Sequence, residues 1–130
     1  MATRATYEIE NHLFYIHHDG YPKGAAQYFL AAMEEGMKND TITLEEAFVR
    51  ANRDNAVVEP IWTHDDHSDT DYRYTVKTAP YQLNPKDMTL MIRVDKKAYN
   101  TITGLSYWAT DYFGTLVNFI AENTANVEAA

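Results

Sequence analysis

Cysteine is absent from this 130-residue chain, which excludes disulfides, thiolate metal sites and cysteine nucleophiles. Glycine and proline are scarce, with 5 and 4 residues, and no glycine-rich phosphate loop or low-complexity tract occurs. No apolar run approaches the roughly 20 residues that span a bilayer, and the first residues lack the apolar stretch of a signal peptide. We therefore expect one soluble domain over residues 1–130, located in the cytoplasm, without a membrane partner.

Basic side chains are also few, with 11 against 19 acidic ones, and the net charge is −8. Residues 1–72 hold 14 acids and 5 bases, whereas residues 73–130 hold 5 acids and 6 bases. A negative surface repels phosphate backbones and attracts basic protein surfaces, so direct nucleic-acid binding is not expected. The acids gather in a first acidic window, residues 34–46, and a second acidic window, residues 59–71.

The hydrophobic periodicity predicts an α+β domain with an antiparallel sheet of about five strands and three helices, in the order ββααβββα. Thr43 and Glu46 have the spacing of a capping box, which predicts a helix start there. Pro60 cannot donate a hydrogen bond to a neighbouring strand, so its strand is expected at a sheet edge or bulge. The expected strands are 6–10, 13–18, 57–63, 72–77 and 88–95, the expected helices are 24–38, 43 to 52–55 and 105–123, and residues 124–130 are expected to fray.

One histidine cluster lies where the second expected strand runs into a turn. On a strand, His17 and Asp19 point to the same face beside Tyr15, so a carboxylate can orient an imidazole for general-base work or metal binding. The structural interpretation is that Asp19-Gly20 forms a turn and that His17 is an ordinary half-exposed strand residue. The sequence favours the structural interpretation, because a catalytic pair needs a third group and a pocket.

A second histidine cluster lies in the acidic loop 64–69, where His64 and His67 stand three residues apart. Its oxygen and nitrogen donors are types that hard cations and zinc bind. The spacing fits no calcium-loop or zinc template, and a solvated polar loop is the alternative interpretation. No cofactor is therefore expected.

Aromatic residues are abundant, with 10 Tyr and 2 Trp, and most of them fall at core periods. Tyr21, Tyr81, Tyr99 and Trp62 instead fall in expected loops or on an edge strand. Exposed aromatic rings next to carboxylates are typical of protein interfaces, where rings supply contact area and charges steer association. The same rings would also stack on a nucleobase.

The first 24 of the 130 residues carry a resemblance. They contain Thr3-Arg4-Ala5, Tyr15, His17, Asp19-Gly20-Tyr21-Pro22 and Gly24. In these residues the chain resembles a group of small uncharacterised bacteriophage and prophage proteins, which implies a mobile-element setting but no activity. In that setting, a short acidic protein is similar in character to anti-CRISPR and other counter-defence inhibitors.

These features favour a non-enzymatic binding protein, an anti-CRISPR-like inhibitor that docks on a basic nucleic-acid-binding surface of a host defence protein or ribonucleoprotein complex. Two alternatives stay open: a nucleotide-sequestering protein and a metal-dependent hydrolase that uses His17, Asp19, His64 and His67. The expected partner-binding residues are Glu34, Glu35, Asp40, Glu45, Glu46, Asp65, Asp66 and Asp69, with Trp62 and Tyr21 as aromatic anchors.

Overall fold

An N-terminal hairpin opens the fold in the computed structural model, which describes residues 3–39, 41–54, 56–81 and 84–128. Strands β1 (Ala5–Ile9) and β2 (His12–Ile16) pair antiparallel. The two residues between them, Glu10 and Asn11, take φ angles of 48° and 77°. Two positive φ angles are typical of a type I′ turn, whose twist matches that of the paired strands. The predicted hairpin is therefore confirmed.

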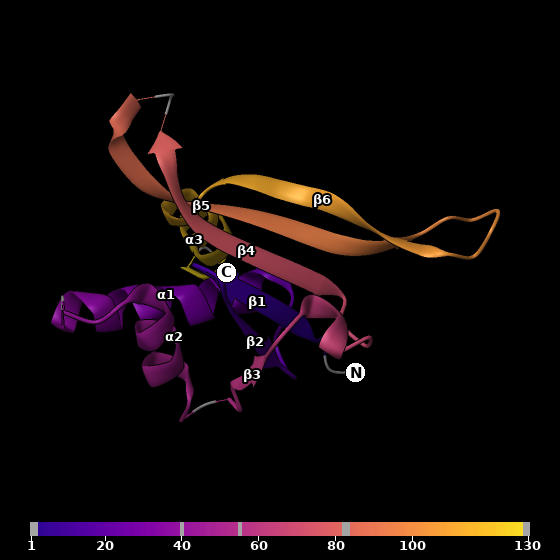
Figure 1. Ribbon diagram of the computed structural model, residues 1–130, viewed down its shortest axis with the longest axis horizontal. Helices are drawn as coiled ribbons and strands as arrows, with labels where there is room; N and C mark the ends of the chain where they lie inside the picture. Colours follow the sequence, from indigo (N-terminus) through magenta and orange to yellow (C-terminus); the bar gives the residue numbers. More distant parts are fainter. Residues whose placement is uncertain (1–2, 40, 55, 82–83, 129–130) are drawn as a thin grey trace.

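Six strands form one mixed sheet in the order β3-β2-β1-β4-β5-β6, seen in Figure 1. Neighbouring strands run antiparallel except β1 and β4, which run parallel. The predicted α+β class with three helices is confirmed, and the sheet contains one more strand than expected. The further strands are β3 (Glu59–Ile61), β4 (Tyr72–Tyr81), β5 (Asn84–Tyr99) and β6 (Ser106–Thr115).

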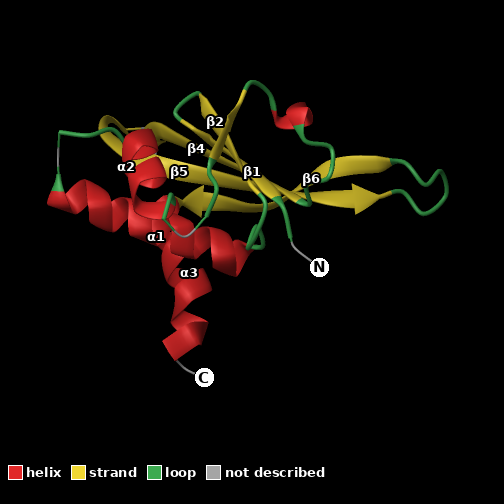
Figure 2. Ribbon diagram, turned by 90° about the horizontal axis from the view of Figure 1, so that it is seen from below, coloured by secondary structure: helices red, strands yellow, loops and turns green. Residues whose placement is uncertain are grey.

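The α-helices lie on one side of the sheet, and the 3₁₀ turn η1 lies on the other, as Figure 2 shows. The core fills the space between helices and sheet. The fully buried ring of Tyr7 on β1 lies 5.8 Å from Phe29 and 5.3 Å from Phe48, measured between ring centroids. These rings join the central strand to two helices. The helical elements are α1 (Pro22–Lys38), α2 (Leu44–Asn52), η1 (His64–Asp66) and α3 (Leu116–Glu128).

The helix predicted over residues 105–123 is wrong in its first half. Residues 106–115 form strand β6, and only the part from Leu116 onward is helical. The segment is rich in Tyr, Trp, Phe and Thr, which favour strands, and its pairing with β5 outweighs the helical spacing of its apolar residues. A bulge in this pairing places Trp108 under Arg73 and Tyr112 against Phe119, on opposite faces of the sheet. The helix also continues through residues 124–128, which were expected to fray.

The turn at residues 17–24 packs tightly against the start of β1. Asp19 takes a positive φ of 57°, and the hydroxyl of buried Tyr74 donates a 2.6 Å hydrogen bond to the Gly20 carbonyl. A Cβ atom on Gly20 would lie 2.8 Å from the Cβ of Ala5, and one on Gly24 would lie 2.1 Å from the carbonyl oxygen of Asp19. Both positions therefore exclude any side chain, which supports the structural interpretation of this segment.

We expect the substitution Gly24→Ala to destabilise the fold by about 1–3 kcal/mol, because the added methyl group collides with backbone that cannot move freely. Gly36→Ala is the matched control, since Gly36 lies in the same helix and has no heavy atom within 4 Å of its Cβ position. Helix propensity alone should make that control more stable by roughly 0.5–1 kcal/mol. Urea denaturation measures both changes, and equal midpoints for the two variants would contradict the prediction.

Candidate functional site

Tyr15 organises the first histidine cluster on the sheet face opposite the helices. The His67 ring stacks on the Tyr15 ring, with centroids 3.5 Å apart and planes at 5°. The Tyr15 hydroxyl lies 3.1 Å from His17 Nδ1 and donates a 3.5 Å hydrogen bond to Asp69. The fold thus brings His17 and His67 together around one tyrosine, and the Tyr21 hydroxyl donates to Asp19 instead.

His64 belongs to a separate polar group. Its Nδ1 lies 2.6 Å from the Thr6 hydroxyl, and its Nε2 lies 3.3 Å from a Glu8 carboxylate oxygen. Burial, together with the nearby Arg73 charge, lowers the pKa of His64. Burial raises the pKa of Glu8, but the hydrogen bond and charge of Lys77 and the contact with His64 outweigh it and lower this pKa. Among the described residues, no three His, Asp or Glu side chains are placed to hold a metal ion.

The second acidic window folds back onto bases of its own chain. Asp65 pairs with Arg73 at 2.6 Å, and Asp69 pairs with Arg4 at 3.2 Å. A carboxylate oxygen of Glu59 lies 2.5 Å from His67 Nε2. These contacts offset much of the negative charge that the sequence places in this window, so Asp65 and Asp69 do not form a free acidic patch.

Asp66, also in the second acidic window, binds its own turn. Its carboxylate accepts the backbone N–H groups of Trp62 at 2.8 Å and Thr63 at 3.1 Å. The hydrogen bond from the Thr63 backbone and that from the Trp62 backbone lower the pKa of Asp66. The carboxylate thereby fixes the chain immediately around Trp62, which is a positioning role for a residue that the sequence suggested as a partner contact.

The first acidic window lies on the helix side of the sheet. Glu34 and Glu35 occupy α1, and Glu45 and Glu46 occupy the first turn of α2, where Thr43 accepts the Glu46 N–H as the capping box predicts. Because η1 lies on the other side, the two windows do not form one continuous patch (Figure 2). Asp40 lies outside the described residues.

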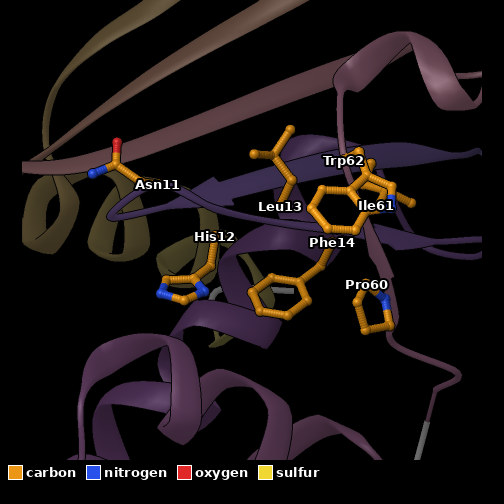
Figure 3. Close-up of a pocket in the computed structure, with 7 residues that line it drawn as sticks. All are labelled: Asn11, His12, Leu13, Phe14, Pro60, Ile61 and Trp62. Atoms are coloured by element: carbon orange, nitrogen blue, oxygen red, sulfur yellow. The ribbon is translucent and has the colours of Figure 1, made fainter.

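The place where both windows approach each other is the edge of the sheet at β3. A hollow of about 350 Å³ lies beside β2 and β3, and Trp62 stands at its rim with 92% of its surface exposed. Figure 3 shows the Phe14 and Pro60 rings side by side in this hollow, as their pairing between β2 and β3 requires. The residues that line it are Asn11, His12, Leu13, Phe14, Pro60, Ile61 and Trp62.

A second hollow of about 530 Å³ continues this one toward α2, since His12 and Phe14 line both. We call the two together the edge groove. Glu45 and Glu46 line its helix end, where Glu45 lies 3.3 Å from His12 and Glu46 lies 3.8 Å from Arg50. The other residues that line this end are Thr43, Val49, Arg50 and Arg53. An aromatic ring, an apolar floor and carboxylates thus meet at one sheet edge.

The predicted aromatic anchors are exposed but lie apart. Tyr21 is 43% exposed and lines a different hollow beside Asp19 and Gln27, so it does not share the edge groove with Trp62. Tyr99 is 62% exposed, and Tyr81 lies outside the residues whose side chains are described. Sequence reasoning identified Trp62 but missed the groove floor, for which Pro60, as a marker of an edge strand, was the available signal.

Comparisons with protein-family models, with curated proteins and with solved structures found no match for this chain. Within the described residues, no helix combines the length and apolar character needed to cross a bilayer. The function is therefore argued from the geometry of the edge groove.

Proposed function

We propose that this chain is a non-enzymatic binding protein whose edge groove docks on a basic surface of a partner protein. The observation that carries the proposal is Trp62, whose ring is 92% exposed at the rim of an apolar groove. Tryptophan is among the residues that most often dominate binding energy at protein interfaces, where it fills a desolvated centre. A cation of the partner placed over its ring would add roughly 0.5–2 kcal/mol.

The contact is made by side chains and not by addition of a strand. β3 has three residues, and Pro60 in its middle lacks a backbone donor. Both features protect a sheet edge from pairing with another strand. The partner therefore meets the Trp62 ring and the groove floor, while the carboxylates of Glu45 and Glu46 attract its basic residues during approach.

The mobile-element setting implied by the N-terminal resemblance points to a class of partner. We propose a host defence complex, with the bound surface being one that otherwise holds a nucleic-acid backbone. The chain's net charge of −8 supports this choice, because such surfaces are basic and attract acidic proteins over a distance of about one Debye length, roughly 8 Å at physiological salt.

Affinity capture from host lysate at low salt, followed by mass spectrometry and a salt wash, tests this proposal. We expect a partner with a basic surface that elutes as salt rises, since charges steer the contact. The double variant Glu45→Gln with Glu46→Gln should weaken its binding by about tenfold, because two exposed charge pairs contribute roughly 0.2–1 kcal/mol each.

The matched control removes two carboxylates at the opposite sheet edge, with Asp111→Asn on β6 and Glu122→Gln on α3. This variant has the same net charge as the first one, so unspecific charge attraction would weaken both equally. Equal binding by the two variants, or a partner that stays bound at high salt, would overturn the proposal.

A further inference from the structure

A two-stranded arm projects from the end of the sheet farthest from the helices, as Figure 1 shows for the tip of β5 and β6. We define the arm as residues 96–109. Lys96 pairs with Tyr72, the first residue of β4, and beyond this point β5 pairs with β6 alone. Lys97 anchors the base of the arm through a 2.9 Å hydrogen bond to the Ser68 carbonyl. The rest of the arm extends past the body of the protein.

Large apolar side chains gather at the arm tip. Tyr99 is 62% exposed, Ile102 93%, Leu105 69% and Tyr107 51%. Four such residues within nine positions are unusual for a surface that remains in water, since scattered apolar side chains are normal but gathered ones mark interaction sites. Burial of each of them in a partner would be favourable by roughly 1.5–3 kcal/mol before the losses of association.

The arm tip is ordered by its own hydrogen bonds. The Asn100 side chain accepts the backbone N–H groups of Ile102 at 2.8 Å and Thr103 at 3.0 Å. The Asn100 N–H donates to Leu105, and Gly104 supplies the left-handed turn conformation with a φ of 74°. A tip that is already shaped loses little conformational freedom on docking, which favours its use as a preformed contact.

The charge of the arm identifies what it docks on. Lys96 and Lys97 give the arm a charge of +2 with no acid among residues 96–109, so the remainder of the chain carries −10. A basic arm on a strongly acidic body is complementary to the body of another copy of the same chain. Contact between two arms would instead oppose their lysines.

We propose that two copies of this chain form a dimer by exchanging arms, each tip packing against the acidic body of the other copy. Such a contact is reciprocal, so a two-fold axis closes it at two subunits. The arm leaves the sheet from β5 and β6, whereas the edge groove lies at β3, the opposite edge. Dimer formation therefore goes beyond the proposed partner binding, and each is tested separately.

Sedimentation velocity of the full chain tests the dimer. We expect the unaltered chain to sediment as a dimer and the double variant Ile102→Asp with Leu105→Asp to sediment as a monomer. Lys96→Glu should weaken the dimer, because it reverses a charge on the arm. The matched control, Val57→Asp with Met37→Asp, changes two residues that are 82% and 84% exposed but lie outside the arm, and it should remain a dimer.

Circular dichroism confirms that each variant is folded before it is compared. A monomeric unaltered chain would overturn the proposal, as would a tip variant that still dimerises. Loss of the dimer in the Val57 and Met37 control would also overturn it, because the contact would then not belong to the arm.

Discussion

Trp62→Ala is expected to weaken binding to the basic partner by about thirtyfold or more, which corresponds to roughly 2 kcal/mol. The indole ring is the largest exposed side chain of the edge groove, and the fold holds its backbone through the hydrogen bond to Asp66. Truncation removes both the contact area and the ring face over which a cation would lie. Calorimetric titration with the captured partner measures the loss.

Two comparisons separate this effect from a general loss of structure. Because Trp62 is 92% exposed, its replacement should change the free energy of unfolding by no more than about 0.5 kcal/mol. Tyr99→Ala removes another exposed aromatic ring, on the arm, and should leave partner affinity unchanged. An unchanged affinity for Trp62→Ala would place the contact elsewhere on the molecule.

Phe48→Ala is expected to lower the free energy of unfolding by about 3–5 kcal/mol, a large share of the 5–15 kcal/mol typical of small domains. Phe48 is fully buried, and its ring lies 5.3 Å from Tyr7 and 5.4 Å from Phe29, measured between ring centroids. Its removal leaves a cavity that surrounding rings fill only in part. Urea denaturation measures the change in stability.

The same substitution should affect the edge groove, because Phe48 lies 6.0 Å from Phe14, which lines both hollows. We therefore expect partner affinity to fall as well, even where the variant is fully folded. Phe113→Ala is the matched control, since that ring is 67% exposed on β6 and should alter stability by less than about 1 kcal/mol. A similar loss in both variants would contradict the assignment of Phe48 to the core.

Much of the fold is local in origin and was predictable from the sequence. The tight turn at Glu10 and Asn11 and the capping box at Thr43 and Glu46 depend on neighbouring residues alone, and both occur as predicted. Strand β6 depends on pairing with a distant segment, and there the helical spacing of its apolar residues misled. The parallel pairing of β1 with β4 is likewise invisible to local patterns.

The site divides in the same way. The exposure of Trp62 follows from its place beside Pro60 on an edge strand, so the sequence could indicate it. The pairing of Asp65 with Arg73 and of Asp69 with Arg4 joins residues brought together only by folding. Counting charges along the sequence therefore overstated how acidic the second window is.

The emission of Trp62 offers the most direct measurement of partner binding at the edge groove. The chain has two tryptophans, so the variant Trp108→Phe leaves Trp62 as the single reporter. A peptide rich in arginine is titrated into this variant at low and at high salt. We predict a blue shift of the emission as the peptide covers the ring, with an affinity that falls steeply as salt rises. Unchanged emission at low salt, or equal affinity at both salt concentrations, would contradict docking of a basic partner at the edge groove.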